Sequence, residues 1–547
     1  IQIPCRSRVT YAKALGLPPD KIRIIKPDIG GAFGAKFEHN LHIICALLAL
    51  KTRRPVKMVH TLEEDFIAGN PRVPMYIDLK LGLTNDGKIT AKEVQIIASN
   101  GARHCMAIPI LSTACYRIDS LYTLENIRTN GYLVYTNTVP KGSFRGFGNA
   151  QMTFALESAL DEAARQLNLD PIDLRLKNAP QDGHVSVHGW KMHTVGLSEC
   201  LKQVRSKSNW DLHHKKKEAY RGIGVACCNH VSGNSGYMPE MDGSAAFIRI
   251  AENGKITVFH GEADMGQGQN TCYAIIAAEE LGVKVEDISV AEVDTDIVPF
   301  GLGSYSSRGT VVGGNAVKKA AADARYKLLE AASDILKKPI TSLNISEGKI
   351  VCIDDPSCSI SIVDVASQYT YSKSGAHIFG YGEYNPDTVY PDLLTKYGNT
   401  SPLYPFAAHV AEVEVDPETG AVTVLNYWAA HDVGRVINRL GLEGQVEGGV
   451  VQGIGWALME DMVTENGKIL NPGFLDYRVP GSLDIPPVNS LFIETNDPNG
   501  PFGAKGIGEP ALNPVPAAIA NAVYDAIGKR IKELPLSPEK VFQTLRR

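Results

Sequence analysis

The stretch on which the fold prediction rests reads Gly-Gly-Ala-Phe-Gly-Ala-Lys, residues Gly30–Lys36. Five further glycine-rich stretches run into segments with helical patterning: Phe144–Asn149 (FRGFGN), Met265–Asn270 (MGQGQN), Gly303–Thr310 (GSYSSRGT), Gly444–Gly449 (GQVEGG) and Gly503–Pro510 (GAKGIGEP). Glycine lets main-chain N–H groups approach a ligand closely, and a helix N-terminus favours negative charge. Six such loops predict one large anionic ligand that the backbone holds at many points.

Two of these stretches nearly repeat each other. Gly31–Lys36 reads GAFGAK and Gly500–Lys505 reads GPFGAK. The match either marks two related turns that face one site from both halves of the chain, or arises by chance between two glycine turns.

Hairpin patterns alternate with helical patterns along the chain. Turns are predicted at residues 85–87, 253–254, 417–420 and 466–467, and helices at residues 151–167, with Asn149 as N-cap, 272–281, 315–336 and 516–527. This mixture predicts an α+β fold of two large mixed α/β lobes with hairpin-rich sheets and a cofactor at their interface. The polar, basic stretch Ser206–Arg221 predicts a boundary that divides the chain into domains of residues 1–215 and 216–547.

Composition excludes several classes of protein. The net charge of −5 over 547 residues is too small to predict a nucleic-acid or membrane partner. No apolar run is long enough to span a bilayer, and Ile43–Leu50 is predicted to be a buried helix. The chain begins with Ile1 rather than Met, so residues are expected upstream.

The cysteines and histidines are dispersed. None of the 10 cysteines forms a C-x-x-C pair, so most are expected to be buried small side chains in a reducing, cytoplasmic compartment. The histidine pair His213–His214 beside Lys215–Lys217 is expected in a solvated connector. A metal held directly by several side chains is not expected, so any metal should arrive inside a cofactor.

Nucleotide-binding motifs are incomplete. A Walker A motif needs Ser or Thr after its lysine, but Phe37 follows Lys36 and Gly506 follows Lys505. The spacing G-x-G-x-x-G is likewise not completed, so neither ATP nor NAD is supported.

One carboxylate stands out among the loop residues. Glu509 lies between Gly508 and Pro510, where a shielded carboxylate can serve as a general base. The alternative is a glutamate at a helix start that complements the helix dipole. Other loop residues are candidates for binding the ligand, but each has an ordinary alternative role as a salt-bridge partner, turn serine, helix cap or core residue. They are Arg145, Arg308, Ser306, Ser307, Gln267, Gln445 and Phe33.

The ordered motifs resemble a known family. Gly30–Lys36, Ser143–Gln151, Met265–Gly268, Gly444–Ile454 and Gly508–Pro510 are similar to the molybdopterin-binding large subunit of the xanthine dehydrogenase/aldehyde oxidase molybdenum hydroxylases. The resemblance covers essentially the whole chain. It implies a molybdenum–molybdopterin cofactor, expected in the cytosine dinucleotide form, with Glu509 as the general base that takes a proton from the metal-bound hydroxyl.

The resemblance also implies which residues contact the cofactor and the substrate. Cofactor binding is expected from Gly31, Phe33, Gly34, Arg145, Gly146, Gly266, Gln267, Gly268, Ser306, Ser307, Arg308, Gln445, Lys505 and Gly506. The substrate pocket is expected from Phe37, Ile108 and Tyr305. Phe37 and Ile108 stand where purine-oxidising members carry polar residues, so an aromatic, N-heterocyclic or aldehyde substrate is expected in place of xanthine.

Partners follow from the same resemblance. Because the chain has no iron–sulfur cysteine motif, electrons are expected to leave through a [2Fe–2S] subunit and an FAD subunit. Family members carry an extra N-terminal region, which is expected here either upstream or on a separate polypeptide. Two alternatives stay open: reductive dehydroxylation of the 4-hydroxybenzoyl-CoA reductase type, which residues 303–308 and 497–501 resemble, and a non-catalytic cofactor-binding homologue.

Overall fold

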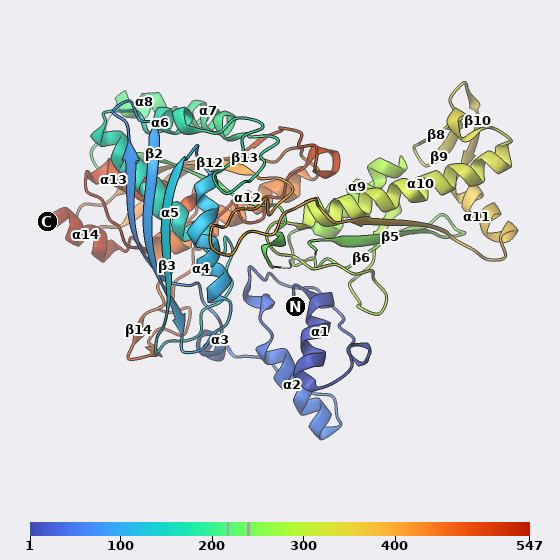
Figure 1. Ribbon diagram of the computed structural model, residues 1–547, viewed down its shortest axis with the longest axis horizontal. Coiled ribbons are helices and arrows are strands. Elements are labelled where there is room, and N and C mark those ends of the chain that lie inside the picture. The colour runs from blue at the N-terminus through green and yellow to red at the C-terminus, as the bar shows by residue number, and fades with distance from the viewer. Residues whose placement is uncertain (216–217, 238–240) are drawn as a thin grey trace.

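Two lobes and a pair of N-terminal helices make up the molecule in the computed structural model (Figure 1), which describes residues 1–215, 218–237 and 241–547. The second lobe comprises residues 244–384, and the first lobe comprises most of the remaining chain. Helices α1 (Pro4–Leu15) and α2 (Asn40–Thr52) lie beside the junction of the lobes. The predicted α+β fold with two mixed lobes is confirmed.

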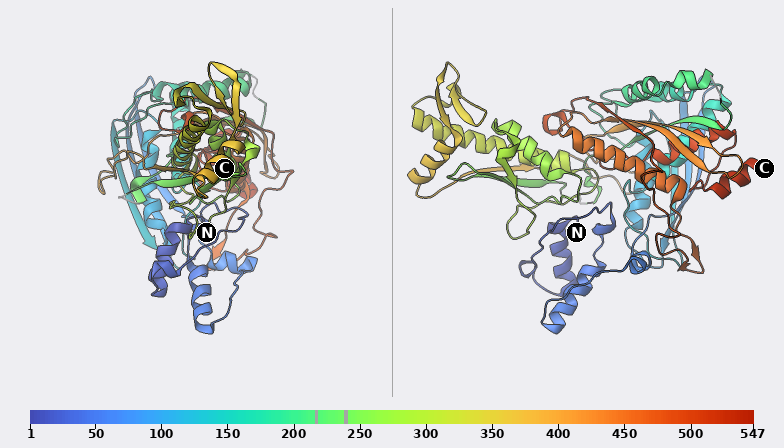
Figure 2. Two further views of the ribbon diagram at one scale, coloured as in Figure 1. Left: turned by 90° about the vertical axis from the view of Figure 1, so that its right-hand side faces the viewer. Right: turned by 180° about the vertical axis from the view of Figure 1, so that it is seen from behind.

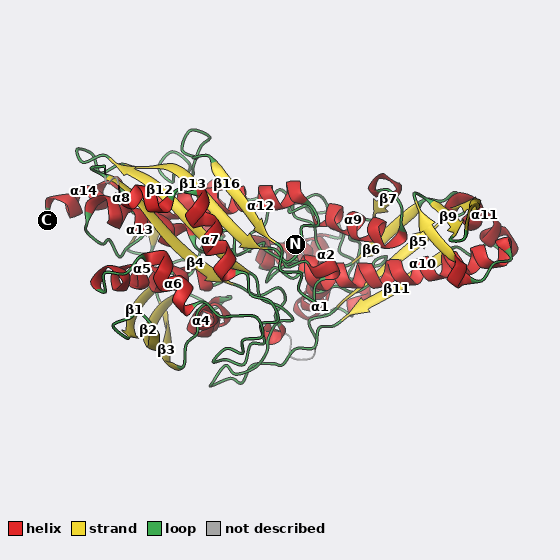
Figure 3. Ribbon diagram, turned by 90° about the horizontal axis from the view of Figure 1, so that it is seen from above, coloured by secondary structure: helices red, strands yellow, loops and turns green. Residues whose placement is uncertain are grey.

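The first lobe contains two sheets. One has the order β16-β13-β12-β4, with β13 and β16 parallel and the other neighbours antiparallel: β4 (Arg221–Asn229), β12 (Phe406–Val415), β13 (Val422–Asp432) and β16 (Val488–Ile493). The other has the order β1-β2-β3: β1 (Met75–Leu83), β2 (Ile89–Gly101) and β3 (Asn126–Tyr135). Figure 3 shows these two sheets from above, with helices between and around them.

Helices cover both sheets of the first lobe. Those that pack most extensively on the strands are α4 (Ala107–Tyr116), α5 (Asn149–Gln166), α7 (Leu197–Lys207) and α13 (Val515–Ile527). The remaining helices are α3 (Leu62–Ala68), α6 (Pro171–Asn178), α8 (Trp210–Lys215), α12 (Arg439–Ile454) and α14 (Pro538–Arg546). The predicted division between residues 215 and 216 falls at residues 216–217, which lie outside the described residues, and it stays a prediction. One core of this lobe contains residues from both sides of that division.

The second lobe has a four-stranded main sheet with long helices along it and a three-stranded sheet at its tip. The order of the main sheet is β11-β5-β6-β7, with bounds β5 (Ser244–Ile250), β6 (Ile256–His260), β7 (Ile288–Val290) and β11 (Ile378–Tyr384). Helix α10 (Gly314–Leu336) packs on β5 and β11, and α9 (Gln269–Leu281) packs against α10. The tip farthest from the first lobe (Figure 2) holds β8 (Leu343–Ser346), β9 (Lys349–Cys352), β10 (Asp355–Ser361) and α11 (Ile362–Ser372).

The same device joins helix to sheet in both lobes. Strands β4 and β11 each carry a Gly-x-Gly pattern, at Gly222–Gly224 and Gly380–Gly382. A Cβ on Gly224 would lie 2.1 Å from the Ala522 nitrogen of α13, and one on Gly382 would lie 2.3 Å from the Ala316 carbonyl of α10. Because glycine has no Cβ, these alanine-rich helices can lie directly on the strand backbone.

The local predictions hold with small shifts. All four hairpins form, the last between β14 (Thr464–Glu465) and β15 (Lys468–Ile469). The four predicted helices begin one to three residues earlier than expected. Asn149 is not the N-cap of α5: Gly148 caps it, with a left-handed φ of 89°, and the Asn149 amide instead donates to the Asn229 carbonyl at 2.8 Å.

Helix α2 corrects one expectation. It forms where a buried helix was predicted, but Ile44, Leu47, Leu48 and Leu50 are between 41% and 50% exposed. The helix projects from the body of the chain in Figure 1, so little of this chain covers it.

No helix among the described residues combines the length and the apolar character that a membrane crossing requires.

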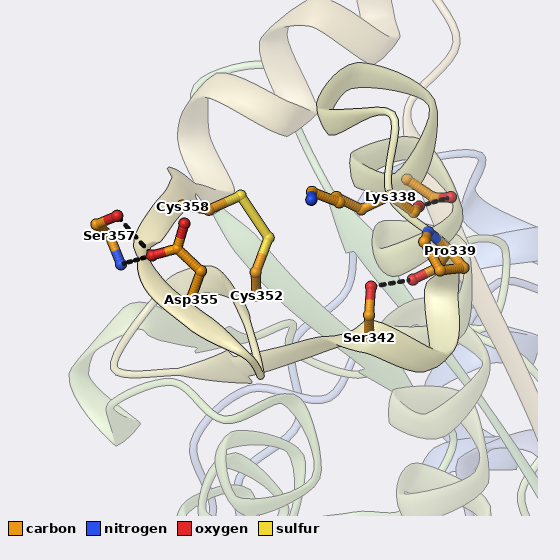
Figure 4. Close-up of a disulfide and its surroundings, with 8 residues drawn as sticks. Lys338, Pro339, Ser342, Cys352, Asp355, Ser357 and Cys358 are labelled. Carbon is orange, nitrogen blue, oxygen red and sulfur yellow. Dashed lines mark hydrogen bonds between the residues drawn. A yellow bond between two sulfur atoms is a disulfide. The ribbon is translucent and has the colours of Figure 1, made fainter.

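A disulfide in the second-lobe tip departs from the cysteine expectation. Cys352 on β9 and Cys358 on β10 are bonded, with Cα atoms 5.5 Å apart (Figure 4). Asp355 accepts hydrogen bonds from Ser357 in the turn between them. The other eight cysteines are free, and the expectation of burial holds for half of them: Cys5, Cys200, Cys227 and Cys228 are buried, whereas Cys45, Cys105, Cys115 and Cys272 are half-buried. The pairing was missed because a six-residue spacing across a strand turn has no motif of its own.

Candidate active site

A cavity of about 520 Å³ lies where loops of both lobes meet. All six glycine-rich stretches contribute to its wall. The predicted site residues that line it are Gly31, Phe33, Gly34, Phe37, Arg145, Gly266, Gln267, Tyr305, Ser306, Ser307, Gln445, Lys505, Gly506 and Glu509. The predicted residues Gly146, Gly268, Ile108 and Arg308 are not part of the wall.

Several wall residues have backbone conformations that side chains rarely adopt. Phe33, Phe147, Ser306 and Ser307 are left-handed, with φ between 46° and 52°. Such a conformation costs on the order of 1–3 kcal/mol for a residue with a side chain and is concentrated at functional sites. Its repetition around one cavity indicates that the surrounding packing holds these loops in a required shape.

The loops interlock across large distances in the sequence. A Cβ on Gly34 would lie 2.4 Å from the Ser143 carbonyl oxygen, and one on Gly506 would lie 2.0 Å from the Ser307 carbonyl oxygen. Any larger residue at either position would push one loop away from the next. These glycines therefore fix the spacing of the wall.

The near-repeat has one backbone shape. Phe33 and Gly34 have φ of 51° and 117°, and Phe502 and Gly503 have φ of 52° and 94°. Both stretches contribute residues to the cavity wall. This geometry favours the interpretation that they are related turns facing one site.

Glu509 is held at the wall by groups from two other loops. Its Oε1 accepts the Gly146 N–H at 3.3 Å, and its Oε2 accepts the Ser307 hydroxyl at 3.3 Å. The Glu509 N–H donates in turn to Ser307 Oγ at 3.0 Å. The side chain is 16% exposed. Glu509 does not start a helix, because α13 begins only at Val515, so the helix-dipole alternative does not apply to it.

Arg145 ties three loops together. Its main-chain N–H donates to the Phe33 carbonyl at 2.8 Å, and its guanidinium donates to the carbonyls of Gly508 and Gln445. Among the described residues no carboxylate lies within 4.0 Å of it. Burial lowers the pKa of Arg145 to about 10, and Glu509 opposes that change. A buried cation without a close counter-charge suits a site for an anionic ligand.

Two other predicted cations are already paired inside the fold. Arg308 is fully buried and bridges Asp242 at 3.1 Å and Glu262 at 2.6 Å. Lys505 lines the cavity, but its ammonium contacts Asp432 at 2.7 Å. Their side chains therefore support the loops at residues 303–310 and 503–510 from behind.

The fifth glycine stretch is not a loop. Gly444–Gly449 lies within helix α12, where a Cβ on Gly449 would lie 2.6 Å from the Cβ of Ala511. Glycine there permits close packing of the helix, and a glycine-rich helix cannot be told from a glycine-rich loop by composition alone. Gln445 still reaches the cavity, and its Oε1 lies 3.4 Å from Arg145 Nη2, which donates to it.

Helix N-termini converge on the cavity as predicted for an anionic ligand. Helix α9 begins at Gln269, the turn before α10 begins at Gly309, and α12 is capped by Asn438, all three of which line the wall. Sequence reasoning missed Asn438 and the neighbouring Arg435, although Asn before a helix is a recognisable cap.

Aromatic and apolar side chains make up another part of the wall. The rings of Phe37 and Tyr305 meet edge to face with centroids 6.1 Å apart, and the wall also contains Phe144, Phe147 and Met106, which sequence reasoning missed. Ile108, on α4, is 58% exposed and is not part of the cavity wall.

Across residues 1–215, 218–237 and 241–547, no group of three or more His, Cys, Asp or Glu side chains is placed to hold a metal ion.

Comparisons with known proteins agree along the whole chain. Two family models, both described as molybdopterin cofactor-binding domains, match residues 1–179 and 199–486. The chain is 32% identical over 554 residues to the xanthine dehydrogenase molybdenum-binding subunit of Escherichia coli O157:H7, covering 99% of this chain and 72% of that protein. It is 31% identical to the nicotine 6-hydroxylase large subunit of Paenarthrobacter nicotinovorans, covering 99% and 68%.

A solved structure gives the same result. The crystal structure of quinoline 2-oxidoreductase from Pseudomonas putida 86 superposes with a TM-score of 0.91 at 26% identity, covering 100% of this chain and 71% of that one.

Proposed function

We propose a catalytic role for this cavity from one premise: the chain belongs to the xanthine dehydrogenase/aldehyde oxidoreductase family of molybdenum hydroxylases, as their molybdopterin-binding large subunit. The proposed reaction inserts oxygen from water at an electron-poor carbon of an aromatic, N-heterocyclic or aldehyde substrate. The observation that carries the proposal is the Glu509 carboxylate, held at the wall of the shared cavity by Gly146 and Ser307.

The residues present fit a molybdopterin group. Three helix starts and the uncompensated Arg145 give the cavity a positive character, which suits a phosphate-bearing ligand. Gln267, Gln445, Ser306 and the main chain at Gly266 would hold it. When bound, this group supplies the two-electron oxidation of the substrate carbon. We propose the cytosine dinucleotide form.

The chain itself supplies proton transfer and orientation. Glu509 Oε2 is the proposed proton acceptor, and Ser307 fixes that oxygen while Gly146 holds the other. Proton transfer requires hydrogen-bond contact between the base and the proton that it accepts. A carboxylate held in one orientation can make that contact more readily than a freely rotating one.

The substrate is proposed to be an apolar ring compound or an aldehyde. Phe33, Phe37, Phe144 and Tyr305 line the cavity, and Phe33 keeps 52% of its surface exposed there. Two relatives are named for N-heterocyclic compounds other than purines, nicotine and quinoline, and the apolar Phe37 in the wall supports such a substrate over xanthine. Ile108 is proposed to border the entrance.

Electron transfer needs partners. The relatives above are named as subunits, and this supports the proposal that [2Fe–2S] and FAD subunits accept the electrons. A cytoplasmic location is proposed on the same family basis.

Oxygen-18 labelling tests the proposal. The assembled complex would be incubated in labelled water with quinoline, nicotine or benzaldehyde and an artificial electron acceptor. We expect label in the product, and we expect Glu509→Gln to slow turnover by about 10²–10⁴-fold. Glu447→Gln, on the exposed face of α12, is the matched control and should keep parental turnover.

Three outcomes would contradict the proposal. Turnover of Glu509→Gln within about tenfold of the parent would remove the assigned base. Reduction of a hydroxylated aromatic thioester without label uptake would indicate the reductive alternative, whereas absence of both reactions in a cofactor-loaded complex would indicate a non-catalytic homologue.

A further inference from the structure

An arginine behind the cavity wall is stacked between two aromatic rings. The guanidinium carbon of Arg72 lies 4.2 Å from the centre of the Phe144 ring and 4.3 Å from the centre of the Trp456 ring. Phe144 is part of the cavity wall, whereas Arg72 and Trp456 are not. A cation over an aromatic face attracts the ring, and the attraction is larger where water is excluded. The stack therefore holds one wall residue from behind.

Main-chain contacts place Arg72 beside the loop that carries Phe144. Arg72 pairs with Gly142 as an isolated parallel β-bridge, two residues before Phe144. The side chain then runs along this loop, and its Nη2 donates to the Arg145 carbonyl at 3.0 Å. Trp456 comes from the turn that continues helix α12 at its C-terminal end. Three separate segments thus meet at one guanidinium.

The guanidinium is a cation at neutral pH. Arg72 is half-buried, and its Nη1 is covered and has no hydrogen-bond partner among the described residues. Burial lowers the pKa of Arg72 to about 9, and Glu460 and Tyr477 oppose that change. The Tyr477 hydroxyl donates to Glu460 at 2.7 Å. Because a covered cation needs favourable neighbours, the two ring faces stabilise this one.

Phe144 lies on the aromatic side of the cavity. A Cβ on Gly34 would come 2.4 Å from the Ser143 carbonyl oxygen, and the Arg145 N–H donates to the Phe33 carbonyl at 2.8 Å. Phe144 is therefore next to the first glycine loop, which supplies further aromatic side chains to the wall. The helix starts that suit an anionic ligand belong to other segments. Phe144 thus borders the part of the cavity that suits an apolar ring.

We propose that Arg72 is a positioning residue that determines substrate selectivity: stacked against Trp456, it holds the Phe144 ring in the wall so that the cavity accepts a planar ring compound. This inference rests on the proposed function and deepens it, because it names the residue that favours ring substrates over small aldehydes. Arg72 stands behind the wall and acts through Phe144.

The test compares two substrates in one preparation of the assembled complex. Quinoline can contact the Phe144 ring, whereas acetaldehyde has no ring to stack on it. The ratio of their kcat/KM values therefore measures this contact and does not depend on how much of the enzyme is active. We expect Arg72→Met to lower the ratio by about 5–30-fold, mainly through the KM for quinoline.

Two further variants frame this result. Arg72→Lys keeps the charge and a donor for the Arg145 carbonyl but lacks the planar guanidinium, so it should fold like the parent and lower the ratio by about threefold. Arg54→Met, at an exposed position after α2, is the matched control and should keep the parental ratio.

A double variant asks whether the effect passes through Phe144. In a Phe144→Leu background, Arg72→Met should leave the ratio within about twofold, because the two changes remove the same contact. A merely structural role would lower kcat/KM equally for both substrates and leave the ratio unchanged, and that result would overturn the proposal. A further large fall of the ratio in the double variant would overturn it as well.

A binding measurement separates this inference from the assigned base. Equilibrium dialysis of quinoline against the complex carrying Glu509→Gln needs no turnover, and the Kd should rise by about 5–30-fold when Arg72→Met is added. An unchanged Kd, or no quinoline binding to either complex, would overturn the proposal, whereas the oxygen-18 experiment decides the proposed reaction independently.

Discussion

Replacing Ser307 separates backbone strain from the hydrogen bond to Glu509. Its hydroxyl donates to Oε2 at 3.3 Å and accepts the Glu509 N–H at 3.0 Å, while its φ is 52°. A hydrogen bond to a charged group contributes about 1.5–3 kcal/mol. If that contribution is lost in the transition state, Ser307→Ala should slow turnover by about 10–150-fold.

The matched variant is Ser307→Gly. It removes the same hydroxyl, but glycine adopts a left-handed φ without the penalty of about 1–2 kcal/mol that alanine keeps. We therefore expect equal loss of turnover in both variants and a higher free energy of unfolding for Ser307→Gly than for Ser307→Ala. Turnover would be measured on the assembled complex and unfolding by urea titration of the chain. Parental turnover in either variant, or equal stability of the two, would contradict the assigned geometry.

Two further predictions concern the stability of the fold. Gly448 is exposed on α12 with nothing within 4 Å of a built Cβ, whereas a Cβ on the adjacent Gly449 would clash. Gly448→Ala should therefore stabilise the fold by about 0.5–1 kcal/mol, and Gly449→Ala should destabilise it by about 1–3 kcal/mol. A change of the same sign for both variants in urea unfolding would refute the packing argument. Burial lowers the pKa of His260 to about 4; because the unfolded chain then binds more protons between pH 4 and pH 6.5, stability should fall as pH falls through that window, by up to about 3 kcal/mol. His260→Gln should flatten the dependence of the melting temperature on pH there, and an unchanged slope would count against it.

Features encoded by neighbouring residues could be predicted from sequence. The turn at Asn253–Gly254 predicts the β5/β6 hairpin because its residues adopt the required backbone themselves. The cavity loops at Gly30–Lys36 and Gly303–Thr310 were found for the same reason. The convergence of the six stretches on one cavity was predicted because each of them could bind the same anionic ligand through its backbone.

Features that depend on contacts between residues far apart in the sequence could not be predicted. Arg308 was expected to contact an anion, but Asp242 and Glu262, far away in the sequence, enclose its guanidinium. The contacts that Gly146 and Ser307 make with Glu509 join residues more than 200 positions apart and have no local pattern at all. Glycine was also ambiguous, since Gly449 serves close packing inside a helix while Gly34 serves a loop.

The placement of the last wall segment has a consequence for how the protein is made. Chains leave the ribosome from the N-terminus and begin folding as they emerge. Strand β4 must wait for β12 to pair and for α13 to cover it, and the turn at Glu509 emerges just before α13. A bulky ligand therefore has no finished socket until the segment around Glu509 has left the ribosome and α13 has packed on β4. A chain that stops before Glu509 lacks part of the cavity wall.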